Sequence, residues 1–108
     1  MRFIKGILRS TFVAVFFGLS AAAVAAEGGD PELGRELFQA WSCGGCHMLA
    51  DAGAMGQIGP SLDGNPNLSY DSLVNSIAYG GGAMPAFGGQ LTDEEIAGLA
   101  AYILEVAE

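Results

Sequence analysis

The chain has 108 residues, enough for one small domain, and its 12 acidic residues outnumber its 4 basic ones. The charges are unevenly spread, because three of the basic residues lie before position 10 and every acidic residue lies at position 27 or later. Such an acidic domain excludes nucleic acid and anionic membrane surfaces as natural partners. The negative charge favours a partner with a basic docking patch. Alternatively, the charge serves only to keep the domain soluble.

Residues 1–26 have the three-part pattern of a cleavable secretory signal peptide. Basic residues begin the segment, an apolar core covers residues 11–19, and small residues complete it. We expect cleavage near Ala25 or Ala26 and export to the periplasm, which leaves a domain of residues 27–108. An uncleaved membrane anchor is the alternative. The uncharged run of residues 10–26 has 17 positions, which is at the short end of the about 17–25 residues that a bilayer crossing requires.

A first helix is predicted from about Pro31 to Ser42. Asp30 is a suitable N-cap, and proline is favoured at the first helical position. Apolar side chains recur at helical spacing at Leu33, Leu37, Phe38 and Trp41. Gly34 lies inside this pattern, and a glycine within a helix costs about 1 kcal/mol relative to alanine. We therefore expect a packing reason for Gly34.

The next residues, Cys43-Gly44-Gly45-Cys46-His47, have the spacing of a c-type haem attachment site. In such a site Cys43 and Cys46 form thioethers with the two haem vinyl groups, and His47 supplies the proximal iron ligand. Other interpretations fit less well. A disulfide across so short a loop stabilises little, a thioredoxin-type pair belongs to a βαβ pattern, and a zinc site needs a fourth ligand. A buried haem would also stabilise a domain with little core of its own.

Two further helices are predicted in the second half of the chain. Ser69 caps a helix of about Tyr70 to Tyr79, and Gly80 ends it. Thr92 and Glu95 form a capping box for a last helix from Asp93 to about Ala107. Its buried stripe is expected to consist of Ile96, Leu99, Ala100, Ile103 and Val106. Residues 48–59 are too irregular for an assignment, and we predict neither a strand nor an internal repeat.

The opposite face of the iron has three candidate ligands, Met48, Met55 and Met84. Met48 adjoins the proximal histidine, and Met55 follows it closely, so both are expected on the proximal side. Met84 is far enough along the chain to reach the distal face, and the glycines around it allow close backbone approach. A core-filling role for Met84 is the alternative. The Pro60 carbonyl is a candidate acceptor for the second imidazole N–H of His47, although an ordinary turn explains Gly59-Pro60 equally well.

On these residues the chain resembles the small monohaem class I cytochromes c of the bacterial periplasm, over essentially all of residues 30–108. The residues that carry the resemblance are Cys43, Cys46, His47, Gly59-Pro60 and Met84-Pro85, together with Gly34, Phe38, Leu99 and Tyr102. The resemblance implies an all-α fold in which three to four helices surround one covalent haem c. It also implies that the N-terminal and C-terminal helices cross, with Gly34 permitting close approach and the aromatic residues packed at the crossing.

The resemblance further implies an electron carrier that performs no bond-making catalysis of its own. Its donor would be a dehydrogenase or a cytochrome bc-type complex, and its acceptor a terminal oxidase, a peroxidase or a photosynthetic reaction centre. We expect a monomer that forms transient complexes without stable membrane insertion. Two alternatives stay open: a haem subunit of a larger redox enzyme, or a ligand-binding or peroxidatic haem protein with a labile distal site. Trp41 precedes the haem motif, so the haem propionate partners cannot be named beyond the guesses Gln57, Asn65 and Gln90.

Overall fold

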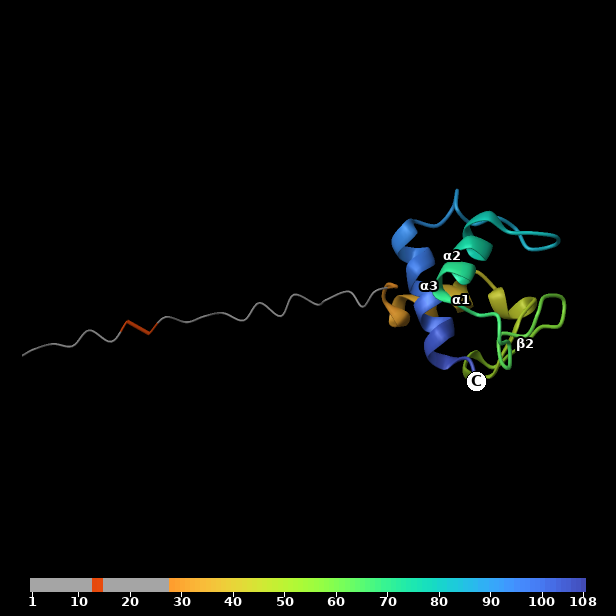
Figure 1. Cartoon of the computed structure of the whole chain (residues 1–108), viewed down its shortest axis with the longest axis horizontal. Helices are drawn as coiled ribbons and strands as arrows, with labels where there is room; N and C mark the ends of the chain where they lie inside the picture. Colours follow the sequence, from red (N-terminus) through yellow and green to blue (C-terminus); the bar gives the residue numbers. More distant parts are fainter. Residues whose placement is uncertain (1–12, 15–27) are drawn as a thin grey trace, which may run out of the picture.

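The structure is a computed structural model that describes residues 13–14 and 28–108. Three α-helices form most of the domain: α1 (Pro31–Ala40), α2 (Tyr70–Tyr79) and α3 (Asp93–Val106). Between α1 and α2 lie the 3₁₀ helices η1 (Cys43–Gly45) and η2 (Ala50–Ala52) and the strands β1 (Met48–Leu49) and β2 (Ala54–Met55). The predicted all-α class is confirmed, and Figure 1 shows α3, in blue, beside α1.

The expected signal peptide and its cleavage site lie outside the described residues, apart from residues 13–14. Within residues 13–14 and 28–108, none of the helices has both the length and the apolar character that a membrane crossing requires.

The helix ends follow from local capping. The carboxylate of Asp30 accepts a hydrogen bond of 2.9 Å from the Glu32 amide at the start of α1. The helix ends at Ala40, two residues before the predicted end, because Ser42 has a left-handed backbone with φ 57°. The predicted bounds of α2 are confirmed, and its capping box is completed by Ser72 rather than by an acidic residue. The predicted capping box of α3 is also present, and this helix ends at Val106.

Residues 48–55 form a short antiparallel hairpin, which corrects the expectation that the chain contains no strand. Met48 of β1 lies opposite Met55 of β2. Gly53 closes the turn with φ 62°, and its amide donates to the Ala50 carbonyl oxygen at 2.9 Å. Each strand has only two residues, so no alternating pattern could indicate it in the sequence.

The close crossing of α1 and α3 depends on two glycines. A Cβ on Gly34 would fall on the carbonyl oxygen of Gly98 and lie 2.5 Å from the Gly98 carbonyl carbon. On the other helix, a Cβ on Gly98 would lie 2.9 Å from the Asp30 carbonyl oxygen. The rings of Phe38 and Tyr102 pack beside the crossing with their centroids 5.8 Å apart. The packing reason expected for Gly34 is therefore present, whereas Gly98 was not anticipated.

An ionic contact fastens η2 to this crossing. The Tyr102 hydroxyl donates to Asp51 Oδ2 at 2.6 Å, and Arg35 Nη1 donates to the same oxygen at 2.7 Å. The Arg35 guanidinium also lies 5.0 Å from the centre of the Tyr102 ring. Burial, together with the hydrogen bond to Asp51 and its negative charge, raises the pKa of Tyr102 to about 12.

The buried core joins all three helices to β1 and to the loops. Its members are Leu37, Phe38, Leu49, Leu62, Leu73, Ile77, Leu91, Ile96, Leu99, Ala100, Tyr102 and Ile103. The stripe predicted for the last helix is confirmed at Ile96, Leu99, Ala100 and Ile103, whereas Val106 is only half-buried. Burial of Tyr102 extends this stripe beyond its predicted members.

Candidate haem-binding site

The cysteine motif forms one tight turn directly after α1. The turn is held by the Cys43 carbonyl oxygen, which accepts from the Cys46 amide at 3.2 Å and from the His47 amide at 3.0 Å. Both thiols are free of disulfide bonding. Partial burial raises the pKa of the Cys43 thiol, and the neighbouring Cys46 raises it further.

The imidazole of His47 is oriented by the turn at Gly59-Pro60. Nδ1 of His47 lies 2.7 Å from the Pro60 carbonyl oxygen, so the expected contact is present. A carbonyl oxygen only accepts, so Nδ1 carries the hydrogen and Nε2 keeps a free lone pair for a metal. Gly59 packs against the same ring, since a Cβ there would lie 2.5 Å from His47 Cε1. The Gly-Pro pair therefore sets both the tautomer and the position of the imidazole.

A second loop clamps the cysteine turn from outside. The Gly59 amide donates to the Cys46 carbonyl oxygen at 2.8 Å, and the Gly56 amide donates to the Gly44 carbonyl oxygen at 3.2 Å. These contacts leave no room for side chains. A Cβ on Gly56 would lie 2.5 Å from the Cys46 carbonyl carbon, and one on Gly44 would lie 2.7 Å from the Ala54 Cβ. Sequence reasoning did not find these two roles.

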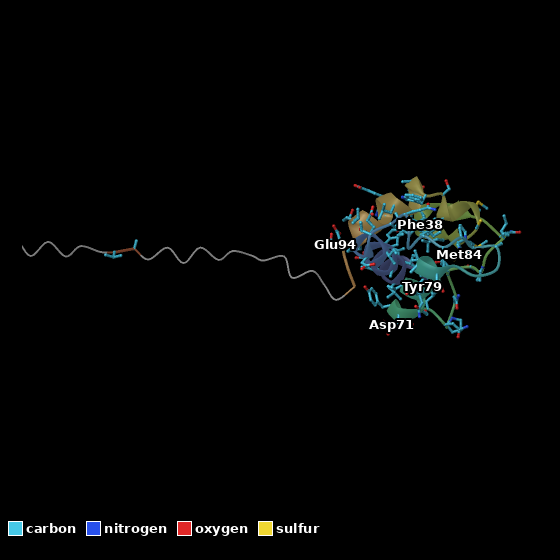
Figure 2. The ribbon with its side chains drawn as sticks, turned by 90° about the horizontal axis from the view of Figure 1, so that it is seen from above. Phe38, Asp71, Tyr79, Met84 and Glu94 are labelled. Carbon is cyan, nitrogen blue, oxygen red and sulfur yellow. The ribbon has the colours of Figure 1, made fainter. Side chains whose placement is uncertain are left out.

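Met84 lies in a loop that is tied to itself and to the end of α2. Gly81 and Met84 exchange two backbone hydrogen bonds, each of 3.0 Å. Gly80 has φ 65°, and a Cβ there would lie 2.5 Å from the Met84 carbonyl oxygen. Further along, the Phe87 amide donates to the Ile77 carbonyl oxygen at 2.9 Å, which satisfies a carbonyl of the last turn of α2. Figure 2 labels Met84 in this loop, well away from Glu94 at the start of α3.

One cavity of about 720 Å³ brings the predicted site residues together. Cys43, Cys46, His47, Pro60 and Met84 all line it. Much of the remaining wall is apolar, including Phe38, Ile58, Leu68, Leu73, Leu99 and Ile103. This volume lies within the about 300–1,000 Å³ of small-molecule and cofactor sites. The donors, the volume and the largely apolar wall of the cavity therefore fit an apolar cofactor that is held by two thiols and ligated by an imidazole.

The three candidate methionines are placed differently. Met84 lines the cavity, whereas Met48 lies in β1 and is not part of the cavity wall. Met55 is 79% exposed to solvent and is also absent from the wall. Among the methionines of residues 28–108, Met84 alone faces the same space as His47.

Only one of the three residues guessed as haem propionate partners lies at the cavity. Asn65 lines the cavity, but Gln57 and Gln90 do not. Asn67, Ser72 and Ser76 also line it, although sequence reasoning did not single them out. The Asn65 side-chain oxygen accepts from the backbone amide of Asn67 at 2.9 Å, so these two lining residues are joined by a local hydrogen bond.

Comparisons with known proteins identify the family to which this chain belongs. The family model described as "Cytochrome C oxidase, cbb3-type, subunit III" matches residues 29–103. Cytochrome c6 of Thermostichus vulcanus is 36% identical over 98 residues, which cover 88% of this chain and 84% of that protein. Among solved structures, the c-type cytochrome SorU from Sinorhizobium meliloti has a TM-score of 0.62 and 42% identity, covering 70% of this chain and 88% of that one. Cytochrome c6 from the diatom Phaeodactylum tricornutum has a TM-score of 0.61 and 39% identity, covering 73% of this chain and 95% of that one.

The chain therefore belongs to this cytochrome c family and is a small monohaem class I cytochrome c. It carries one covalent haem c. Its function is electron transfer rather than enzymatic catalysis. The resemblance drawn from the sequence is thus confirmed in family, fold, cofactor and broad function.

Proposed function

We propose that this protein is a periplasmic electron carrier whose haem is attached through Cys43 and Cys46 and whose iron is ligated by His47 and Met84. The observation that carries the proposal is the single cavity that these four side chains line. The haem supplies single-electron exchange between ferric and ferrous iron. A thioether ligand raises the reduction potential relative to a second histidine.

The polypeptide's part in this proposal is to hold the ligands still. Pro60 keeps the proton on Nδ1 of His47 through the 2.7 Å contact, and Gly59 supports the ring. The loop bonded to α2 holds Met84 in place, and the apolar wall keeps water from the site. With His47 and Met84 both bound to the iron, no coordination position would be left for a substrate. The same ligands would serve both oxidation states, which suits rapid electron exchange.

Export and partner choice belong to the same proposal. Residues 1–26 would direct the chain to the periplasm and be removed near Ala25 or Ala26, and mass spectrometry of the periplasmic protein would give the mature N-terminus. The mature part holds one arginine against twelve acidic residues. That arginine, Arg35, is already bonded to Asp51. This charge supports transient docking with a basic redox partner, such as a dehydrogenase, a cytochrome bc-type complex or a terminal acceptor of a respiratory chain.

The axial ligands are tested by the optical spectrum of the ferric protein. Met84→Ala should abolish the weak long-wavelength methionine–iron band, whereas Met55→Ala is the matched control because Met55 is exposed and outside the cavity. Absence of the band in the wild type, with rapid carbon monoxide binding by the ferrous form, would instead indicate a labile distal site.

The attachment residues are tested separately. Cys43→Ala or Cys46→Ala should abolish stable haem retention, and with it the fold, because the cavity walls lose the group around which they pack. Retention is measured from the haem absorbance that stays with the chain in denaturant. A variant that stays folded and helical without haem would count against the haem as the stabilising element.

A second candidate function is a haem subunit of a larger redox enzyme. It is favoured by the matching family model, that of subunit III of cbb3-type cytochrome c oxidase. Size-exclusion chromatography of the natively purified protein separates the two, since a free carrier elutes as a small monomer and a subunit elutes with its complex.

A further inference from the structure

Two aromatic side chains meet at the cavity, one from each of the segments that supply its ligands. The rings of Trp41 and Phe87 have their centroids 6.0 Å apart and lie at 86° to each other, in an edge-to-face arrangement. Both residues line the cavity. Trp41 is 37% exposed, which places the pair at the boundary between the cavity and solvent.

The pair connects two chain segments, residues 41–47 and 80–91, between which the described residues make no hydrogen bond. Trp41 is the C-cap of α1 and stands two residues before Cys43. Phe87 stands three residues after Met84, and its amide is fixed to the Ile77 carbonyl oxygen at the end of α2. The backbone hydrogen bonds of the Met84 loop join it to itself and to α2. The Trp41–Phe87 contact joins the same loop to the segment that carries the cysteines.

We propose that Trp41 and Phe87 form an aromatic latch that holds the Met84 loop against the cavity and limits how often Met84 leaves the iron. Both are positioning residues, because they act through Met84. The inference rests on the proposed function, since it requires Met84 to be an iron ligand. Edge-to-face aromatic pairs contribute enough free energy to change an opening equilibrium by about two- to tenfold.

The test uses the haem-loaded protein and cyanide binding to its ferric form, whose rate depends on how often the distal position becomes free. Trp41→Leu and Phe87→Leu should each bind cyanide about two- to tenfold faster than wild type. The double variant should bind no faster than the faster single one, because both changes remove the same contact. Trp41→Phe keeps a ring at the position and should restore most of the slow rate.

Tyr79→Leu is the matched control. Tyr79 is an aromatic residue at the end of α2 that is 78% exposed and absent from the cavity wall (Figure 2). Its variant should bind cyanide at the wild-type rate. An equal acceleration in Tyr79→Leu, or strictly additive effects of the two latch substitutions, would overturn the latch. If Trp41→Leu fails to retain haem, Phe87→Leu and Trp41→Phe make the same comparison.

The two proposals fail in different ways. If the wild type lacks the methionine–iron band and Met84→Ala binds cyanide at the wild-type rate, the ligand role of Met84 is wrong and the latch falls with it. If the band is present and is lost in Met84→Ala, but Trp41→Leu and Phe87→Leu bind cyanide at the wild-type rate, only the latch is wrong.

Discussion

Replacing Gly34 by alanine tests whether close approach of α1 and α3 stabilises this domain. The new methyl group would lie 2.5 Å from the Gly98 carbonyl carbon and 2.7 Å from the Tyr102 Cβ. Both atoms belong to the rigid part of α3, so no side-chain rotation relieves the overlap. The two helices would have to separate, and Phe38 and Tyr102 would lose their contact beside the crossing.

Two effects of opposite sign compete in this variant. Alanine favours a helix over glycine by about 1 kcal/mol. Overpacking usually costs about 1–3 kcal/mol, and a clash with backbone lies at or above the upper end. We therefore expect Gly34→Ala to lower the free energy of unfolding by about 2 kcal/mol. In a domain of this size that corresponds to a fall in Tm of about 8–16 °C.

Thermal and urea unfolding of the haem-loaded protein, followed by circular dichroism, measures this change. Gly89→Ala is the control, because a Cβ at Gly89 meets no atom within 4 Å. Its stability should stay within about 0.5 kcal/mol of wild type. A Gly34→Ala protein that is as stable as wild type would show that helix propensity outweighs the crossing, and the packing argument would be wrong.

Three further predictions follow from named contacts. Because the pKa of Tyr102 is raised from 10.0 to about 12, the unfolded chain loses this proton first, so stability should fall as pH rises from 10 to 12. Tyr102→Phe should remove that fall in urea midpoints, and an unchanged slope would contradict the assignment. Gly59→Ala places a methyl group 2.5 Å from His47 Cε1 and should shift the reduction potential of the haem. Gly89→Ala is the control and should leave the potential unchanged, because a Cβ there meets no atom within 4 Å. Equal potentials in Gly59→Ala and the wild type would refute the supporting role of Gly59. Electron exchange with a basic redox protein should slow as salt shortens the Debye length from about 10 Å at 0.1 M to about 3 Å at 1 M, and a salt-independent rate would remove docking by charge.

Much of the fold was predictable because the signals are local. Ser69 and Gly80 are adjacent to the ends of α2, and the hydrogen bonds they make or permit are decided within one helical turn. The same holds for Thr92 and Glu95 at the start of α3. The first helix was predicted two residues too long because the left-handed backbone at Ser42 has no marker in its residue type.

The haem site also has a part that the sequence predicted and a part that only the folded chain shows. The proposed attachment and proximal ligation rest on five consecutive residues, because two thiols and an imidazole would have to meet one macrocycle at short range. The sequence already favoured Met84 over Met48 and Met55 by its distance from His47 along the chain, and the folded chain adds that Met84 lines the cavity while Met55 faces solvent. By contrast, the Pro60 carbonyl remained one of two equal interpretations until its distance of 2.7 Å from His47 Nδ1 was known.

The sequence by itself therefore determined the family, the cofactor and the helices, whose patterns depend on near neighbours. The tertiary structure decided which residues are required by contacts with segments that are distant in the sequence. Gly98 is needed because Gly34 lies against it, and Gly56 because the backbone of Cys46 lies where its side chain would be. A glycine in a sequence shows only that a side chain is missing. The atom that occupies the space belongs to another segment, and only the folded chain brings the two together.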